Sequence, residues 1–332
     1  MKQLTILGAG SWGTALSIVL APRFETVRLW AHEAELVSRM AETRENGLYL
    51  PGFKLPANVL PASDFETALA GSAIVLGVTP SHHLRRVFTQ ILPYLSPEVS
   101  FVSATKGIEN GSLMRMSEVM RSVLDLRNEP KIAVLSGPTF AREVASGQPT
   151  AVVIASENEE FASLIQTAFS GPTFRLYTNA DPIGVEVGAA LKNVIAIGAG
   201  ICQGLGLGSN AVAALVTRGL AEISRLAVAM GGNPRTLSGL AGLGDLVLTC
   251  NGELSRNRRV GIALAEGMAL HQILATTNFV AEGVQTTYAA VDLSHRHGIE
   301  MPITEQMYAV LRLDRPPKEA IRELMERSLK RE

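Results

Sequence analysis

The chain has 332 residues with 30 basic and 31 acidic side chains, which gives a net charge of −1. This length suits two domains of ordinary size, and the near-neutral charge excludes a global field that would hold a nucleic acid or an anionic membrane surface. Hydrophobic residues make up 47% and charged residues 18%, so the composition excludes a disordered chain and indicates a globular one.

The first half of the chain alternates short aliphatic or β-branched runs with amphipathic stretches of helical length. This pattern is typical of parallel strands linked by crossover helices. The runs are short and flanked by Gly, Pro, Asp or Ser, as buried strands commonly are. The sequence predicts an α/β, Rossmann-type doubly wound domain over residues 1–180. Its expected strands are residues 4–7, 27–30, 74–78, 101–103, 132–135 and 152–154.

A glycine motif directly follows the first predicted strand. Gly8, Gly10 and Gly13 fit the pattern G-x-G-x-x-G, with Ser11 and Trp12 inside it, and the motif opens a predicted helix. The first glycine permits a tight turn, the second lets the backbone approach a pyrophosphate, and the third lets the helix pack on the strand. The context predicts that these five residues bind NAD or NADP.

The choice between the two coenzymes depends on the end of the second predicted strand, where His32 and Glu33 stand. Glu33 lies 20 residues after Gly13, near where an acid bonds the ribose 2′-hydroxyl of NAD. His32, which we count as a cofactor contact, could instead face the 2′-phosphate of NADP. Both could also cap a solvated helix, so the preference stays open.

After Asp181 and Pro182 the composition changes to long stretches rich in Ala, Leu, Gly and Met, and strand-like runs disappear. The sequence predicts an all-α, substrate-binding domain over residues 181–332, with helices at 183–200 and 211–230. The longest apolar stretch, 187–201, is shorter than the ~20 residues that a membrane span needs, so no membrane partner is expected. No linker separates the halves, and active sites often lie at such a junction.

The two cysteines, Cys202 and Cys250, have no C-x-x-C spacing and no companion histidine cluster. The sequence therefore predicts neither a disulfide framework nor a metal site, and we expect reduced thiols in a cytoplasmic protein.

Lys192 is a lone charge in the apolar stretch 187–201. A buried ammonium is costly without a partner or a purpose, and desolvation lowers a lysine pKa towards neutrality, where it can donate a proton to an alkoxide. From the residues alone, a lysine that reaches the surface along a buried helix is the simpler interpretation.

Other polar residues also allow both a functional and a purely structural interpretation. The run Ser255, Arg256, Asn257, Arg258 and Arg259 suits bidentate contact with a phosphate, but a charge run is usually a solvated face.

Similarly, Lys106 follows a predicted strand, at the sheet edge where ligands collect, but can be a surface lysine before Gly107. Asp245 follows a glycine-rich stretch and can bond substrate hydroxyls or cap a helix. Glu282 alone would pass as a surface acid.

Taken together, six segments resemble the NAD(P)-dependent glycerol-3-phosphate dehydrogenase family of the bacterial type. The similarity runs in order and at family-like spacing from the glycine motif to at least residue 287. The segments are residues 104–107, 136–141, 188–194, 239–246, 255–259 and 280–286.

The resemblance implies that Lys192 is the general acid and base. It implies substrate contacts from Lys106, Gly137, Thr139, Lys192, Asp245, Ser255, Arg256 and Asn257. It adds cofactor contacts from Lys106, Ala141, Arg256, Val280 and Glu282. Many relatives carry serine where Thr139 stands, so the hydroxyl is kept.

The implied activity is the interconversion of sn-glycerol 3-phosphate and dihydroxyacetone phosphate by hydride transfer, with a small phosphorylated molecule as substrate. The resemblance also implies a cytoplasmic homodimer that supplies glycerol 3-phosphate for phospholipid synthesis. One alternative is a related two-domain hydroxy-acid dehydrogenase, whose anion site would take a carboxylate. The other is a non-catalytic dinucleotide sensor, against which the intact set of Lys192, Asp245 and Arg256 argues.

Overall fold

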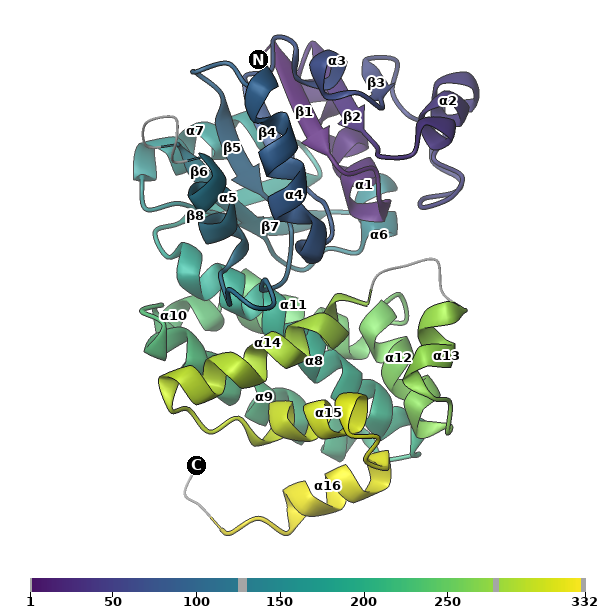
Figure 1. The fold of residues 1–332 in the computed structure, drawn as a ribbon, viewed down its shortest axis with the longest axis vertical. Coiled ribbons are helices and arrows are strands. Elements are labelled where there is room, and N and C mark those ends of the chain that lie inside the picture. The colour runs from purple at the N-terminus through teal and green to yellow at the C-terminus, as the bar shows by residue number, and fades with distance from the viewer. Residues whose placement is uncertain (1, 125–129, 277–280, 330–332) are drawn as a thin grey trace. The chain divides into compact units, whose positions relative to one another are not determined.

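The structure is a computed structural model that describes residues 2–124, 130–276 and 281–329 (Figure 1). The chain forms two compact units, Met1–Lys106 with Met114–Pro182 and Gly107–Leu113 with Ile183–Glu332. The segment Gly107–Leu113, which the predicted division after residue 180 leaves in the first domain, groups with the second unit. Ile108 and Leu113 of this segment lie in the core of the helical unit.

The first unit contains an eight-stranded sheet in the order β3-β2-β1-β4-β5-β6-β7-β8. The chain winds outward from β1 to β3 and then from β4 in the other direction, so the predicted doubly wound fold is confirmed. The strands are β1 (Gln3–Leu7), β2 (Thr26–Trp30), β3 (Val59–Ala62), β4 (Ile74–Gly77), β5 (Ser100–Ser103), β6 (Ile132–Ser136), β7 (Thr150–Ala155) and β8 (Phe174–Asn179).

All six predicted strands are present, and the two that the sequence analysis missed are the edge strands β3 and β8. Strand β3 contains Pro61, which lacks an N–H donor and is tolerated where one side of the strand stays unpaired. Strand β8 alternates between buried and exposed residues because one of its faces is solvated. Neither strand has the continuous apolar run that a central strand shows.

The expectation of parallel pairing throughout is wrong at one place, because β6 and β7 pair antiparallel. The connection between them contains only α6 (Ala141–Ala145), which has 5 residues. At ~1.5 Å per residue such a helix spans less than half of a five-residue strand. It does not carry the chain back along the strand, so β7 returns in the opposite direction.

Helices cover both faces of the sheet (Figure 1). Leu4 and Ile6 of β1 face one core together with α1, α6 and α7, whereas Leu7 faces the other core with α3, α4 and α5. This alternation follows from the two-residue period of a strand. The helices are α1 (Ser11–Leu20), α2 (Ala34–Thr43), α3 (Phe65–Leu69), α4 (Ser81–Ile91), α5 (Met116–Leu124), α6 and α7 (Glu159–Phe169).

The second unit is helical, and its described residues from 183 onward contain no strand. Its helices are α8 (Pro182–Gly204), α9 (Ser209–Ala229), α10 (Pro234–Leu237), a π-helical turn (Leu240–Gly244), α11 (Asp245–Asn251), α12 (Arg256–Ala265), α13 (Leu270–Ala275), α14 (Glu282–His297), α15 (Pro302–Arg312) and α16 (Pro317–Met325). The predicted helices at 183–200 and 211–230 correspond to α8 and α9.

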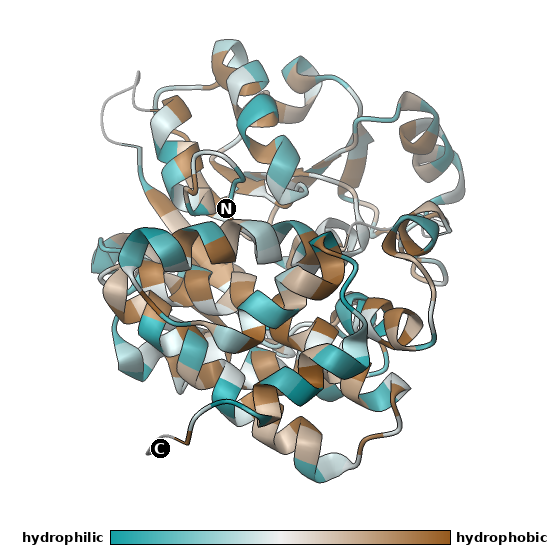
Figure 2. Cartoon of the chain, turned by 60° about the horizontal axis from the view of Figure 1, so that its bottom comes forward, coloured by the Kyte–Doolittle hydropathy of each residue, from teal (hydrophilic) through white to brown (hydrophobic). Residues whose placement is uncertain are grey.

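Helix α8 is the core of this unit. Every residue from Gly184 to Cys202 is buried, and the helix contributes side chains to both apolar clusters of the unit. Among the described residues it is the one helix long and apolar enough to cross a membrane, but its apolar window is 100% buried. In Figure 2 the surrounding helices are banded hydrophobic and hydrophilic, as helices packed around a core are.

Candidate functional site

The glycine turn between β1 and α1 has the geometry that its motif predicts. Gly8 adopts a φ of 119°, and a Cβ there would meet the backbone oxygen of Val78 at 2.8 Å. A Cβ on Gly13 would overlap the backbone oxygen of Gly8, whereas one on Gly10 would meet nothing within 4 Å. Two glycines therefore allow tight packing, and the third leaves open space beside the backbone.

Asn46 holds this turn from outside the motif. Its side-chain amide donates to the backbone oxygen of Ala9 at 2.7 Å and to the Thr14 hydroxyl at 2.8 Å. Its Oδ1 accepts the N–H of Tyr49 at 3.1 Å, and the Ser11 hydroxyl donates to the backbone oxygen of Tyr49 at 2.7 Å. Asn46 is completely buried. It was not predicted from the sequence, where its signal is its place before Gly47, Leu48 and Tyr49.

These features fit a dinucleotide. Gly10 is the N-cap of α1 and makes no side-chain capping bond, so the first N–H groups of the helix face outward for an anion. The indole Nε1 of Trp12 is buried without a hydrogen-bond partner among the described residues. His32, after the end of β2, is exposed.

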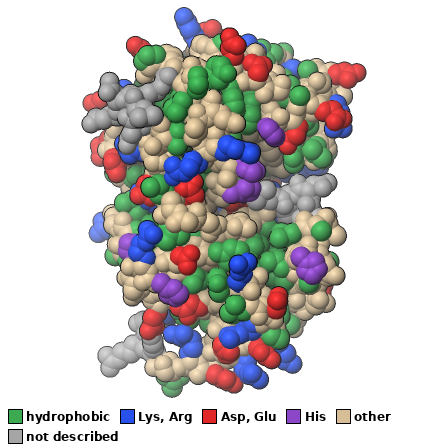
Figure 3. Space-filling view, viewed as in Figure 1, with side chains coloured by type: hydrophobic (Ala, Val, Ile, Leu, Met, Phe, Trp, Pro, Cys, Tyr) green, Lys and Arg blue, Asp and Glu red, His purple; other side chains and the backbone are tan. Residues whose placement is uncertain are grey.

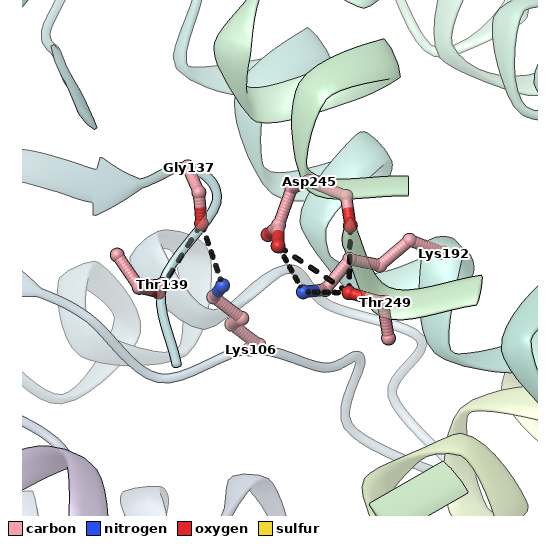
Figure 4. A network of polar contacts seen from close by, with 6 residues as sticks. All are labelled: Lys106, Gly137, Thr139, Lys192, Asp245 and Thr249. Atoms are coloured by element: carbon pink, nitrogen blue, oxygen red, sulfur yellow. Dashed lines mark hydrogen bonds and ion pairs between the residues drawn. The ribbon is translucent and has the colours of Figure 1, made fainter. Parts of the chain in front are cut away.

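A second group of predicted residues lies at the carboxyl ends of β5 and β6 (Figure 4). The Lys106 ammonium donates to the backbone oxygen of Gly137 at 3.2 Å, and the Thr139 hydroxyl donates to the same oxygen at 3.2 Å. Gly137 has a φ of 147°, and a Cβ there would lie 3.0 Å from the Cα of Val152. Ala141 is the first residue of α6, in the same connection. The structure thus brings Lys106, Gly137 and Thr139 together.

In the helical unit, Lys192 has polar partners in the core. Its ammonium donates to Oδ1 of Asp245 and, at 2.8 Å, to the Thr249 hydroxyl. That hydroxyl donates to the backbone oxygen of Asp245 at 2.6 Å (Figure 4). Lys192 is 5% exposed and Asp245 is 0% exposed, so Lys192 does not reach the surface. Asp245 does not cap α11, whose N-cap is Gly244. Thr249 was not predicted from the sequence.

Small residues let α8 approach the π-helical turn that precedes α11. Gly188 lies one turn before Lys192 on α8, and a Cβ there would meet the backbone oxygen of Ala241 at 2.9 Å and Gly242 Cα at 3.4 Å. Residues four apart share one face of a helix, so the surface that admits the π-helical turn also carries Lys192. The glycines around residue 240 therefore bring the Asp245 carboxylate to the ammonium.

The two cysteines, Cys202 and Cys250, are buried free thiols. Burial raises the pKa of Cys250 to about 12, and the nearby Asp245 carboxylate also raises it, against the opposing effect of Lys192. Cys250 therefore packs as a neutral thiol near the network. Within the described ranges, no group of three or more His, Cys, Asp or Glu side chains is arranged to hold a metal ion.

The basic run lies at the start of α12. Ser255 is the N-cap, and its hydroxyl accepts the N–H of Arg258 at 3.3 Å. Asn257 is 8% exposed, and its Oδ1 accepts the N–H of Gly283 at 3.0 Å. Ser255 and Asn257 are thus fixed from two sides of the exposed Arg256, which begins the helix.

Arg256 has charged neighbours on two helices. Loss of hydration lowers the pKa of its guanidinium, the Glu282 carboxylate raises it, and Arg259 lowers it. An arginine stays charged throughout such changes. Glu282 is the first residue of α14 and is half-buried. Val280, the remaining predicted cofactor contact, lies outside the described residues.

Comparison with known proteins decides the family. The N-terminal model of NAD-dependent glycerol-3-phosphate dehydrogenase matches residues 3–162, and its C-terminal model matches residues 181–322. A protein of Koribacter versatilis named glycerol-3-phosphate dehydrogenase [NAD(P)+] is 56% identical over 98% of each chain. The chain belongs to the NAD(P)-dependent glycerol-3-phosphate dehydrogenase family.

Other members of the glycerol-3-phosphate dehydrogenase family agree over the full length. A Geobacter sp. (strain M21) protein of the same name is 52% identical and covers 100% of this chain and 99% of its own. The crystal structure of the Coxiella burnetii glycerol-3-phosphate dehydrogenase has a TM-score of 0.94 at 43% identity, over 98% of this chain and 99% of that one. The resemblance deduced from the motifs is confirmed. The role of each site residue stays a prediction.

Proposed function

We propose that this chain is an oxidoreductase that interconverts sn-glycerol 3-phosphate and dihydroxyacetone phosphate with NAD or NADP. The observation that carries the proposal is the buried Lys192 ammonium, held by Asp245 and Thr249, in a chain of this family. A buried charge with fixed orientation is suited to proton transfer at one atom.

When bound, the nicotinamide supplies or accepts the hydride. Lys192 Nζ donates a proton to the oxygen on C2 of dihydroxyacetone phosphate as the hydride reaches C2. In reverse it takes the hydroxyl proton as the hydride leaves. Ketone, reduced coenzyme and one proton thus give the secondary alcohol and oxidised coenzyme. Asp245 and Thr249 orient the ammonium through the bonds described above.

Arg256, Ser255 and Asn257 bind the substrate phosphate in this proposal. Arginine offers a bidentate fork of N–H donors to a phosphate. Because the Ser255 oxygen and Asn257 Oδ1 accept backbone N–H groups, the hydroxyl proton and the amide NH₂ are oriented as donors. Arg256 thereby gains two neutral donors beside it. Lys106, Gly137, Thr139 and Asp245 complete the substrate contacts.

The dinucleotide is assigned to the glycine turn and to residues that follow the strands and begin the helices. Two arguments support this assignment, namely the open space at Gly10 and the uncapped start of α1. The assigned contacts are Gly8, Gly10, Ser11, Trp12, Gly13, His32, Lys106, Ala141, Arg256, Val280 and Glu282.

Family membership also supports four broader proposals. They are a division into domains at residues 1–180 and 181–332, a homodimer, a cytoplasmic location, and a role in supplying glycerol 3-phosphate for phospholipid synthesis. The two family models, which match residues 3–162 and 181–322, support the first. Size-exclusion chromatography with light scattering tests the homodimer, and a monomer at working concentration would contradict it.

Turnover of dihydroxyacetone phosphate, followed by the absorbance of NADPH or NADH, tests the activity. We expect oxidation of the reduced coenzyme by the wild type. Arg256→Ala should raise the apparent KM about tenfold to a hundredfold, because a charged hydrogen-bonded contact to the phosphate is lost. A wild type that turns over a 2-oxo acid but no phosphorylated ketone would contradict the proposal.

Arg259→Ala is the matched control, because it removes an exposed guanidinium from the same helix at a position with no assigned substrate role. Dihydroxyacetone, which lacks the phosphate, provides a second control. Because Arg256 is also assigned as a coenzyme contact, the two substrates are compared at saturating coenzyme. Arg256→Ala should then leave the slow turnover of dihydroxyacetone unchanged if the guanidinium acts on the phosphate. Equal losses with both substrates would show that Arg256 does not act on the phosphate.

A further inference from the structure

The glycine turn is flanked by two other chain segments at the same edge of the sheet. Leu7, the last residue of β1, pairs with Trp30 of β2 on one side and with Gly77 of β4 on the other. The three strands therefore end in one row. His32 follows β2 by two residues, and α4 begins four residues after β4, at Ser81. A dinucleotide on the turn lies between these two segments.

Four basic or titratable side chains gather there, and we call His32, His82, His83 and Arg86 the His32–Arg86 cluster. The rings of His82 and His83 lie 4.0 Å apart. His32, His82 and Arg86 are exposed and His83 is half-buried. In Figure 3, His and Lys or Arg side chains lie close together where Figure 1 draws α4.

The members of this cluster repel one another when charged. Burial lowers the pKa of His83, and His82, Arg86 and His32 lower it further. His32 and the side chains of α4 are therefore within electrostatic reach, although they come from segments 50 residues apart in the sequence. The first turn of α4 carries no acid to balance them. An anion bound among them would relieve the repulsion.

Two acids, Glu33 and Glu35, follow His32 in the sequence, and Glu33 favours a preference for NAD over NADP. Its carboxylate does not cap α2, and it raises the pKa of Tyr49, after the larger effect of burial. Tyr49 belongs to the loop that holds the glycine turn. Glu33 could thus bond a ribose 2′-hydroxyl, whereas Glu35 pairs with Arg39 at 3.6 Å. Neither acid is among the charges that act on His83.

We propose that the His32–Arg86 cluster binds the 2′-phosphate of NADP(H), and that His83 and Arg86 of α4 determine a preference for NADP(H) over NAD(H). This proposal rests on the dinucleotide binding proposed above. Arg86 supplies a fixed charge and a fork of donors, and the imidazoles supply N–H donors. A 2′-phosphate carries close to two negative charges at neutral pH and suits such a cluster.

Isothermal titration of the protein without coenzyme tests this assignment. The probes are NADPH, NADH, 2′,5′-ADP and 5′-AMP, and the last two differ only in the 2′-phosphate. The wild type should bind NADPH at least about tenfold more tightly than NADH, and 2′,5′-ADP more tightly than 5′-AMP by the same factor. One hydrogen bond to a charged group accounts for a difference of this size. Equal affinities within each pair would overturn the proposal.

Variants of α4 identify the residues. His83→Gln and Arg86→Ala should each weaken NADPH and 2′,5′-ADP about tenfold and leave NADH and 5′-AMP unchanged, and Arg86→Lys should keep part of the preference. Arg121→Ala, an exposed arginine on α5 of the same unit, is the control and should change nothing. Losses of equal size for NADPH and NADH would show a structural effect and overturn the assignment to the phosphate.

The two proposals fail differently. If NADPH binds tightly through Arg86 but dihydroxyacetone phosphate is not turned over, the proposed activity is wrong and the assignment of the cluster to the 2′-phosphate stands. If dihydroxyacetone phosphate is turned over but NADPH and NADH bind equally well, the assignment of the cluster is wrong and the proposed activity stands. A protein that binds neither dinucleotide would overturn both.

Discussion

The glycine turn of the first unit depends on the backbone, whereas the Lys192 network of the second unit depends on charged and polar side chains. The turn presents backbone N–H groups, and its residues matter because they have no side chain. The network presents a buried ammonium, and its residues matter because their charges and hydroxyl are paired in an apolar core. A change to a glycine of the turn therefore acts through steric overlap and backbone conformation, whereas a change to the network acts through the balance of two buried charges.

The two regions also differ in the span of sequence that forms them. Gly8, Gly10 and Gly13 lie between the end of β1 and the first turn of α1, so a local motif describes the turn except for the contacts of Asn46. Lys192 and Asp245 are 53 residues apart, and their contact depends on the packing of α8 against the π-helical turn. Local patterns can therefore predict the first kind of site, and only tertiary structure or family resemblance can predict the second.

The largest effect that tests this contrast is expected at Lys192. Lys192→Ala should lower kcat on the order of a thousandfold, because general acid catalysis is lost, with coenzyme affinity unchanged. It should also destabilise the helical unit, since the buried Asp245 carboxylate then loses the ammonium that balances its charge. Steady-state kinetics, coenzyme titration and urea unfolding measure the three quantities.

A double variant separates catalysis from stability. Lys192→Met with Asp245→Asn removes both charges, and it should recover most of the stability lost in Lys192→Ala without recovering turnover. Turnover that recovers in the double variant would show that Lys192 is not the general acid. A single variant as stable as the wild type would mean that the pair is not a buried ion pair in solution.

The same contrast explains which predictions from sequence succeeded. The six central strands were predicted because they are continuous apolar runs, whereas β3 and β8 were missed because Pro61 and the alternation in β8 mark edge positions. The antiparallel return to β7 was missed because the length of α6 cannot be read from composition. Asn46 and Thr249 were missed because their hydrogen-bond partners lie far away in the sequence. Asn46 bonds Ala9 and Thr14 of the turn, and Thr249 bonds Lys192.

A pair of glycine variants sharpens the contrast with a smaller effect. Gly13→Ala should destabilise the first unit by roughly 2 to 4 kcal/mol, because the added Cβ overlaps the Gly8 backbone oxygen and α1 must move. Gly10→Ala should leave the stability within about 0.5 kcal/mol, because a Cβ there meets nothing within 4 Å. Thermal unfolding of both variants measures the difference.

Dinucleotide titration then distinguishes packing from binding. Gly10→Ala should weaken NADPH and NADH alike, by about tenfold or more, because the methyl occupies the space where a pyrophosphate approaches the backbone. If Gly10→Ala binds NADPH and NADH as tightly as the wild type, the pyrophosphate does not bind beside Gly10. Equal destabilisation by the two variants would contradict the geometry of the turn itself.

The last prediction concerns a buried carboxyl group of the helical unit that takes no part in the proposed chemistry. Glu222 of α9 is 2% exposed, and its carboxylate accepts the N–H groups of Ile303 at 2.7 Å and Thr304 at 3.2 Å and the Thr304 hydroxyl at 3.2 Å. Those N–H groups belong to the first turn of α15, which begins with Pro302. A side chain of one helix thus caps another.

Burial raises the pKa of Glu222 to about 7, and the hydrogen bonds from Ile303 and Thr304 and the charge of Arg225 only partly oppose it. A carboxyl whose folded pKa exceeds its unfolded value stabilises the fold most at low pH. That contribution is complete below the unfolded value of 4.5 and is lost as the pH rises through about 7. From pH 4.5 to 8 the loss amounts to roughly 3 kcal/mol.

Glu222→Gln keeps the shape of the side chain and removes the titration. The free energy of unfolding of the wild type should therefore fall relative to that of the variant between pH 5 and pH 8, as measured by urea unfolding at several pH values. Glu305→Gln, which removes a carboxyl from the first turn of the same helix α15, should follow the wild type. If the wild type and Glu222→Gln keep a constant difference across this range, Glu222 titrates near its ordinary value. The hydrogen bonds from the first turn of α15 would then offset the cost of burying the Glu222 carboxylate.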